Sequence, residues 1–243
     1  MVFSAVDLVL VIPDKADPER DQVAAEWNAA GGTTLRLGRF WDPPPLEPTR
    51  VRLYGNDTFC LVLEQKLRLA LCSPADDLLV TLDCDLLGRR IKKSRLSAVR
   101  SEYPAFIKSV IPKQIPSRVY ASADELRAEC EGLDPETELL YSEPIELRSE
   151  VRCFVLDGEV LDCACYEGST PVDAAREFAE AVARRVRLPR AVVLDVGELG
   201  SGRWVVIEFN AAWGAGLNGC DARRVLPAIE AATGPASPAP LIP

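Results

Sequence analysis

Residues 191–213, AVVLDVGELGSGRWVVIEFNAAW, restrict the possible folds of this chain more than any other stretch. Two runs rich in Val, Leu and Ile, residues 191–199 and 203–211, are separated by Gly200, Ser201 and Gly202. Glycine and serine at such a junction accept the positive φ angles of a tight reversal, and apolar runs on both sides are typical of paired strands. The stretch therefore predicts a buried β-hairpin.

Asp195, Glu208 and Asn210 interrupt this hairpin and are called the polar trio below. If the turn is symmetric about Ser201 and Gly202, Asp195 faces Glu208, and Asn210 shares Glu208's face because side chains alternate with period two. Neighbouring carboxylates destabilise a hairpin unless a cation lies between them, and oxygen donors alone suit Mg²⁺. The alternative is an exposed polar face. The apolar flanks favour a metal site.

Composition excludes several classes of function. The chain has 243 residues and a net charge of −9, which argues against a general nucleic-acid or anionic-membrane binder but not against local nucleotide binding. It has no histidine, so His-based triads and His-ligated metals are excluded. No apolar run is long enough to span a bilayer. The scattered cysteines and the absence of a signal peptide predict a cytoplasmic protein with reduced thiols.

The first half alternates strand and helix patterns. Strands are expected at residues 3–12, 34–37 and 51–55, and helices at 18–30 and from Asn56 or Asp57 to about 72. This alternation predicts a small α/β layer with a parallel sheet. Residues 76–100 are predicted to be helical with a break near Gly88. Their basic cluster is interpreted as a solvated helix face, or as a linker with cations turned toward an anionic ligand.

The second half predicts antiparallel sheets. Strands are expected at residues 106–110, 118–121, 138–145, 150–156 and 159–166, and helices from 123, at 171–186 and at 222–232, before a disordered tail, GPASPAPLIP. Lys108 lies in the middle of an apolar strand. A lysine there is costly unless an anion pairs with it. We therefore expect Lys108 to meet a ligand anion or, alternatively, a carboxylate of the protein.

The charged residues of this half combine into the parts of an ATP site. Lys108, Lys113 and Arg152 can neutralise phosphate oxygens, while the polar trio can hold the Mg²⁺ ions that bridge them. A free backbone edge at residues 142–145, SEPI, could offer N–H and C=O groups to adenine. Glu150 and Arg152 share a strand face, so they could also form an ion pair with each other, and both roles can coexist.

Together these motifs resemble the ATP-grasp superfamily. The resemblance is carried by YGND, LLGRRI, AFIKSV, RVYASADEL, YSEPIELRSEVRCFVLDGEV, YEG, AVVLDVGEL and WVVIEFNAAWGAG, from Tyr54 to near the end. It is strongest to the divergent R-to-K clade, which includes a eukaryotic cell-division-cycle protein that assists translation initiation factor assembly. The implied fold is α/β and α+β. It has an N-terminal pre-ATP-grasp domain (1–100), two ATP-sandwiching subdomains (101–146 and 147–233) and a tail (234–243).

The resemblance also implies roles for individual residues. Lys108 and Lys113 would touch the α- and β-phosphates, Arg152 would lie on the γ-phosphate side, and Glu150 would bind the ribose or orient its neighbour. The adenine hinge would consist of Ser142, Glu143, Pro144 and Ile145, and Tyr166 would form part of the site wall. The polar trio, Asp195, Glu208 and Asn210, would ligate Mg²⁺. The loop SVIPKQIPSR lacks glycine, so Lys113 with Arg118 is expected to replace backbone donors by charge.

The activity implied by the resemblance is ligation. ATP would phosphorylate a carboxylate, and an amine would displace phosphate from the acylphosphate, with Lys108 and Arg152 as catalytic residues. The expected partners are ATP with Mg²⁺, a carboxylate and an amine, with a peptide or protein among the candidates, and neither nucleic acid nor membrane. The alternatives are an ATP-binding assembly factor without turnover and a small-molecule kinase.

Overall fold

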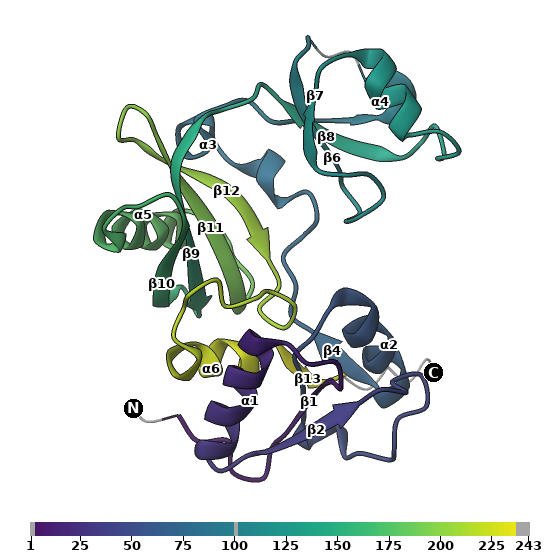
Figure 1. The fold of residues 1–243 in the computed structure, drawn as a ribbon, viewed down its shortest axis with the longest axis vertical. Coiled ribbons are helices and arrows are strands. Elements are labelled where there is room, and N and C mark those ends of the chain that lie inside the picture. Colours follow the sequence, from purple (N-terminus) through teal and green to yellow (C-terminus); the bar gives the residue numbers. More distant parts are fainter. Residues whose placement is uncertain (1–2, 100–101, 237–243) are drawn as a thin grey trace, which may run out of the picture.

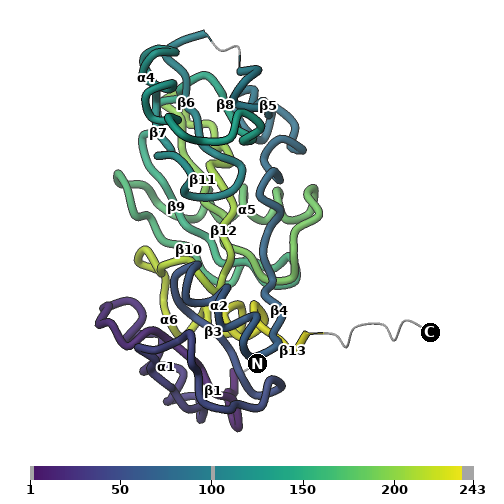
Figure 2. The backbone as a smooth tube through the Cα atoms, turned by 90° about the vertical axis from the view of Figure 1, so that its right-hand side faces the viewer, coloured from purple at the N-terminus to yellow at the C-terminus, as the bar shows by residue number. Residues whose placement is uncertain are grey.

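A computed structural model describes residues 3–99 and 102–236 of the chain. The molecule is elongated, with three layers stacked along its long axis (Figures 1 and 2). An N-terminal α/β layer lies at one end, a four-stranded sheet with α5 lies in the middle, and a second four-stranded sheet with α4 lies at the other end (Figure 1). The expected combination of an α/β layer with two α+β units is confirmed.

The N-terminal layer is built on a parallel sheet. Its elements are β1 (Val9–Pro13), α1 (Pro18–Ala29), β2 (Thr33–Leu37), η1 (Pro48–Arg50), β3 (Val51–Leu53), α2 (Asp57–Leu67) and β4 (Leu69–Leu71). The parallel order β2-β1-β3 confirms the predicted sheet. Helix α2 begins at the Asn56 cap and ends at Leu67, not near residue 72, because Arg68 turns into the left-handed region (φ 54°). The strand β4 that follows was missed in the sequence.

The C-terminal end of the chain returns to this layer. Helix α6 (Ala222–Ala231) packs beside α1, and β13 (Thr233–Pro235) pairs antiparallel with β4 (Figure 1). Arg52 of β3 donates to Glu230 Oε1 over 2.6 and 2.9 Å, with both side chains largely buried. Ordered structure therefore extends into the predicted tail at 234–243, and residues 237–243 lie outside the described part of the chain.

The secondary structure of residues 76–100 differs from the sequence prediction. They form η2 (Leu78–Thr81), the single-turn helix α3 (Cys84–Leu87), β5 (Lys92–Arg95) and η3 (Leu96–Ala98) instead of helices on both sides of a break near Gly88, and Arg100 lies outside the described residues. Gly88 ends α3 with φ +64°. The basic run then extends as an edge strand, where Lys93 meets the carboxylates of Asp77 and Glu138 at 2.9 and 3.3 Å. The sheet of the small subdomain thus begins before residue 101.

The small sheet has the antiparallel order β5-β8-β6-β7, from β6 (Ala105–Ser109), β7 (Arg118–Tyr120) and β8 (Glu138–Ser142), with α4 (Ala123–Glu129) on one face. Ser122 caps α4 by accepting the Glu125 N–H over 3.2 Å. Strand β8 lies inside the sheet and ends at Ser142. The predicted strand at 138–145 is therefore wrong in its last three residues, which form a connecting segment that leads into the next sheet.

The middle sheet carries both predicted hairpins. Its order is β10-β9-β11-β12, from β9 (Leu147–Leu156), β10 (Glu159–Glu167), β11 (Ala191–Leu199) and β12 (Trp204–Asn210), with α5 (Val172–Arg185) on one face. Val192 and Leu194 of β11 face the core under α5, whereas Ala191 and Val193 face α6 and the N-terminal layer. Asp195 continues this second face. No helix in the described part of the chain is long and apolar enough to cross a membrane.

Candidate active site

Strand pairing brings the polar trio together. Asp195 on β11 stands directly opposite Glu208 on β12, which confirms the register expected from the hairpin turn. On its other side Asp195 stands opposite Arg152 of β9. The Asn210 amide Nδ2 donates to Asp195 Oδ2 over 3.1 Å and to Glu208 Oε1 over 3.0 Å. Three neighbouring strands therefore present one polar cluster on a single face of the sheet.

Arg152 and Asp195 form a buried bidentate ion pair. Arg152 Nε and Nη2 donate to the two Asp195 carboxylate oxygens over 2.9 and 2.7 Å, and the residues are only 9% and 1% exposed. Burial raises the pKa of Asp195, and the Arg152 guanidinium offsets part of that effect. Burial alone would lower the pKa of the Arg152 guanidinium, but the hydrogen bond and charge of Asp195, together with Tyr166 and Glu208, raise it. Arg152 is therefore held charged in a desolvated position.

A third hydrogen bond fixes the Arg152 guanidinium plane. Its Nη1 donates to the Gly216 carbonyl over 2.9 Å. A guanidinium carries five N–H groups, of which these contacts use three. The remaining two can donate to a ligand anion.

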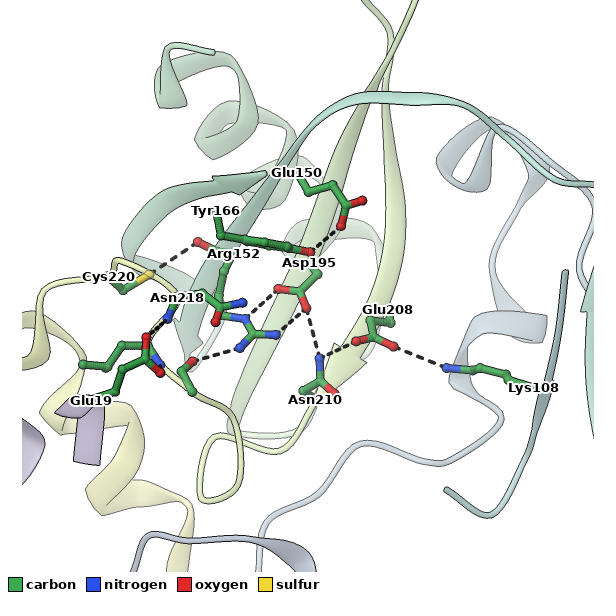
Figure 3. Close-up of polar contacts among 12 residues, drawn as sticks. Glu19, Lys108, Glu150, Arg152, Tyr166, Asp195, Glu208, Asn210, Asn218 and Cys220 are labelled. Carbon is green, nitrogen blue, oxygen red and sulfur yellow. Dashed lines mark hydrogen bonds and ion pairs between the residues drawn. The ribbon is translucent and has the colours of Figure 1, made fainter. Parts of the chain in front are cut away.

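Lys108 connects this cluster to the small sheet. Its Nζ lies 3.5 Å from Glu208 Oε2, with side chains 21% and 38% exposed. A line of polar contacts thus runs from Arg152 through Asp195, Asn210 and Glu208 to Lys108 across the space between the two sheets (Figure 3). Of the two partners expected for Lys108, the structure shows the carboxylate. The same ammonium group lies at the wall of the cavity described next.

A cavity of about 210 Å³ lies between the two sheets. Its walls are mostly apolar, and the charged groups Lys108, Glu208 and Glu150 line it together with Arg89 and Glu143. The remaining lining residues are Leu79, Ile91, Phe106, Val119, Leu140, Tyr141, Ser142, Pro144, Ile145, Leu147 and Ile207. An apolar slot with a few charged groups is typical of a small-molecule site.

The segment proposed from the sequence as a hinge lines this cavity. Ser142, Glu143, Pro144 and Ile145 all contribute to its wall. Ser142 is buried, and its hydroxyl donates to the Glu143 carbonyl over 3.1 Å. Glu143 Oε1 accepts the Arg90 N–H over 3.1 Å, and hydrogen bonds from the backbone N–H groups of Glu143 itself and of Arg90 lower the Glu143 pKa. These contacts fix the segment that joins the two sheets.

Glu150 and Tyr166 form a separate pair beside Arg152. The Tyr166 hydroxyl donates to Glu150 Oε2 over 2.7 Å, and the Arg152 guanidinium carbon lies 5.7 Å from the Tyr166 ring centre. Burial is the main cause that raises the Tyr166 pKa. The ion pair considered between Glu150 and Arg152 is replaced by the bond of Arg152 to Asp195. Tyr166 touches Arg152 rather than the cavity, whereas Glu150 lines the cavity wall.

Lys113 and Arg118 do not line the cavity. Lys113 Nζ lies 2.6 Å from Asp57 Oδ2 at the start of α2, and its side chain is 73% exposed. Arg118 pairs with Glu125 and Glu129 and stacks on the Tyr120 ring. The expected replacement of backbone donors by these two cations is not visible in this arrangement, because both are bound to protein carboxylates.

Oxygen donors of the polar trio fit a hard cation in chemistry, but they are engaged with protein partners. The residues described contain no group of three or more His, Cys, Asp or Glu arranged to hold a metal. Both Asp195 oxygens accept from Arg152, and Asn210 turns its amide nitrogen toward the carboxylates. Rotation of that amide by 180° would present its oxygen, completing two carboxylates and one amide oxygen, a donor set suited to Mg²⁺.

Arg89 is a cavity residue that the sequence analysis did not single out. It is buried, and its guanidinium donates to the carbonyls of Leu87, Val206 and Ile207 over 3.0, 3.1 and 3.4 Å. Burial lowers its pKa. Arg89 lies within LLGRRI, in the basic cluster interpreted from the sequence as a solvated helix face or as a linker with cations turned toward an anionic ligand. Its position beside Gly88, at the end of a short apolar run, was the available signal.

Comparisons with known proteins agree with this architecture. The RimK domain ATP-grasp protein from Sphaerobacter thermophilus is 15% identical, with a TM-score of 0.61 over 91% of this chain and 98% of that chain. D-alanine–D-alanine ligase from Bacillus anthracis is 12% identical, with a TM-score of 0.55 over 92% and 96%. Macrocyclase MdnC from Microcystis aeruginosa, bound with precursor peptide MdnA, is 12% identical, with a TM-score of 0.53 over 84% and 90%. At such identities the likeness shows the fold alone.

A search of curated proteins found no match. The model of one domain family, by contrast, matches residues 86–228, which is more than half of the 243 residues. This stretch includes Lys108, Arg152 and the polar trio, and it confirms the resemblance found in the sequence. The chain belongs to the ATP-grasp domain family, family 2 of the R-to-K clade.

Proposed function

We propose that this chain is an ATP-dependent ligase that forms an acylphosphate from a carboxylate and joins it to an amine. The observation that carries this proposal is the cavity between the two sheets, whose lining includes both Lys108 and Glu208 and which the polar cluster adjoins. The family assignment supports nucleotide binding in that cavity. D-alanine–D-alanine ligase, one of the similar structures, is a ligase by name.

The apolar part of the cavity suits a purine ring. Phe106 and Leu140 of the small sheet and Ile207 of the middle sheet line the same cavity. The backbone of residues 142–145, at the join of the two sheets, supplies polar groups for the ring edge. With adenine there, the triphosphate extends toward Lys108 and Glu208. Lys108 exchanges its carboxylate partner for phosphate oxygens, which costs little because the pair is partly exposed.

The proposed reaction has two balanced steps. A substrate carboxylate oxygen attacks the γ-phosphorus of ATP, the bond to the bridging oxygen breaks, and ADP leaves with that electron pair. The amine nitrogen then attacks the acyl carbon, phosphate leaves, and the nitrogen loses a proton as the amide forms. No side-chain nucleophile is required, which suits a chain without histidine.

The protein's part in both steps is electrostatic. Lys108 and the two free N–H groups of Arg152 donate to the transferring phosphoryl group, where negative charge develops. Asp195 and the Gly216 carbonyl hold Arg152 in place, so its donors need no reorganisation during the reaction. Removal of one such donor typically raises the barrier by about 3 kcal/mol. Mg²⁺, held by Glu208, Asn210 and Asp195, would supply further charge neutralisation of the phosphates when bound.

The substrates to test first are amino acids and peptides. Macrocyclase MdnC was solved with a precursor peptide bound, and D-alanine–D-alanine ligase carries its amino-acid substrate in its name. We therefore include a peptide or protein carboxylate, with a peptide or free amine as the acceptor, in the proposed substrate class.

The test is ADP release in the presence of Mg²⁺ and a library of carboxylates and amines, with the Lys108→Ala variant as the control. ADP release that requires both a carboxylate and an amine, and that is lost in the variant, supports the ligase. Tight ATP binding without turnover would support an assembly factor instead. A stable phosphorylated product formed without an amine would identify a kinase.

A further inference from the structure

The loop between β12 and α6 is held in place by the N-terminal layer. The Gly55 N–H donates to the Trp213 carbonyl over 2.9 Å, and the Tyr54 hydroxyl donates to the Ala215 carbonyl over 2.9 Å. Both donors follow β3, at the carboxyl end of the parallel sheet. The conformation of the loop that follows β12, the strand of Glu208 and Asn210, is therefore fixed by hydrogen bonds from the N-terminal layer.

Glu19, at the start of α1, makes the third contact. Its Oε2 accepts the Leu217 N–H over 2.9 Å and its Oε1 accepts the Asn218 N–H over 2.8 Å. Both carboxylate oxygens thus bind consecutive backbone N–H groups of the loop (Figure 3). Asn218 and Gly219 have left-handed φ angles of 47° and 88°. Successive N–H groups in such a turn form a concave anion-binding surface, here filled by Glu19.

The same loop touches Arg152 at two atoms. The Gly216 carbonyl accepts from Arg152 Nη1 over 2.9 Å, and Cys220 Sγ lies 3.5 Å from the Arg152 carbonyl. Gly216 also lies against Glu19, since a Cβ there would come within 2.6 Å of Glu19 Oε2. The Gly216 carbonyl that orients Arg152 and the Leu217 N–H that Glu19 binds therefore belong to one planar peptide group.

We propose that Glu19 is a positioning residue that couples the N-terminal layer to Arg152. By fixing residues 216–218, the Glu19 carboxylate sets the Gly216 carbonyl and hence the direction of the two Arg152 N–H groups left for the γ-phosphate. This inference rests on the proposed function, because it takes Arg152 to act on the terminal phosphate. It adds a residue outside the matched family region, 86–228, to the machinery of the site.

Asp21 provides a matched control on the same helix. It also lies in the first turn of α1, where a carboxylate favours the positive end of the helix dipole. Its ion pair is with Arg36, 2.6 Å away and exposed, and therefore apart from the loop. A role of Glu19 confined to the helix dipole predicts the same effect for both residues, whereas positioning predicts an effect for Glu19 alone.

The experiment compares Mg–ADP with Mg–AMPPNP, a non-hydrolysable ATP analogue, by calorimetry. In Glu19→Gln, which keeps the size but leaves one backbone N–H without an oxygen acceptor, we expect the ADP affinity to stay within about twofold. The preference for AMPPNP over ADP should fall about tenfold. This is a typical loss when a residue that orients a ligand-binding group through hydrogen bonds is removed. Asp21→Asn should leave that preference unchanged. In an Arg152→Lys background, Glu19→Gln should have no further effect on it.

A second readout is independent of nucleotide. Amide hydrogen exchange at Leu217 and Asn218 should accelerate in Glu19→Gln and not in Asp21→Asn. An unchanged nucleotide preference in Glu19→Gln, with wild-type binding intact, would overturn the coupling while leaving the proposed function standing. An equal loss in both variants would also overturn it. If the wild-type protein binds neither nucleotide, the proposed function fails, and the coupling fails with it.

Discussion

Among single residues, Asp195 and Glu208 differ in burial and in partners, although both belong to the polar trio. Asp195 is buried and bonded to Arg152 through both oxygens, whereas Glu208 is partly exposed and meets Lys108 at 3.5 Å. A buried charge left without its partner is far more costly than an exposed one. The two carboxylates should therefore respond differently to removal.

We expect Asp195→Ala to lower the free energy of unfolding by about 3–5 kcal/mol, because it leaves the Arg152 guanidinium buried and unpaired. Glu208→Ala should lower it by no more than about 1 kcal/mol, while still weakening Mg–ATP binding. Urea unfolding followed by circular dichroism measures both values. Equal destabilisation by the two variants would contradict the difference in burial.

Lys108 allows a test of the proposed contact with the phosphates of ATP. We expect Lys108→Ala to weaken Mg–ATP binding about 10- to 100-fold, as the loss of a charged hydrogen bond would. Lys66→Ala on α2, away from the cavity, should leave the affinity unchanged. Calorimetric titration distinguishes them, and an affinity in Lys108→Ala equal to that of the wild type would remove Lys108 from the phosphate site.

Residue types and strand periodicity were sufficient to predict the polar trio and its register. They could not supply the partner of Arg152, because the adjacency of β9 and β11 is set by the packing of a whole sheet and not by local sequence. Lys113 shows the same limit. Its loop reaches Asp57 of the N-terminal layer, a contact between residues far apart in the chain that no local pattern encodes.

At the scale of elements, residues 76–100 show how tertiary context overrides a helical pattern. Leu79, Leu82, Leu86 and Leu87 follow a helix-like spacing, yet they pack as short turns onto the middle sheet. Gly88 then lets the chain turn sharply beside Val205. Lys92 and Lys93, which follow it, adopt a strand conformation because their backbone pairs with β8 at the edge of the small sheet.

Gly88 gives this element a test. We expect Gly88→Ala to lower the free energy of unfolding by about 2–5 kcal/mol, the sum of about 1–2 kcal/mol for the left-handed backbone and about 1–3 kcal/mol for overpacking. A Cβ there would lie 2.5 Å from Val205 Cγ1. Gly132→Ala is the control, because its φ is also positive, at +83°, but a Cβ added there would meet no atom within 4 Å beyond its own chain neighbours. Thermal unfolding should show a clearly larger loss at Gly88, and equal losses would exclude the steric contact.

At the scale of the whole molecule, the N-terminal layer is not an independent attachment. Its core is continuous with α6, β9 and β11, and β13 completes the pair with β4. The alternation of strands and helices predicted the layer itself. It could not show that the chain's C-terminal end returns to it, because that closure joins residues more than 150 positions apart, as in the Arg52 to Glu230 bond.

This continuity has a measurable consequence. We expect a fragment of residues 76–243, which lacks the N-terminal layer, to lose cooperative unfolding, because the apolar faces of α6 and β11 become exposed to water. Circular dichroism against urea would show this as a broad transition. A sharp transition with near-native stability would mean that the layer is an independent domain.

The most direct test of the proposed nucleotide site is a crystal structure of the full chain with Mg²⁺ and AMPPNP. We expect adenine against residues 142–145 between the two sheets, phosphate oxygens within hydrogen-bond distance of Lys108, and Mg²⁺ bound by the polar trio, Asp195, Glu208 and Asn210. A nucleotide bound elsewhere, with Lys108 still paired to Glu208 beside an empty cavity, would contradict it.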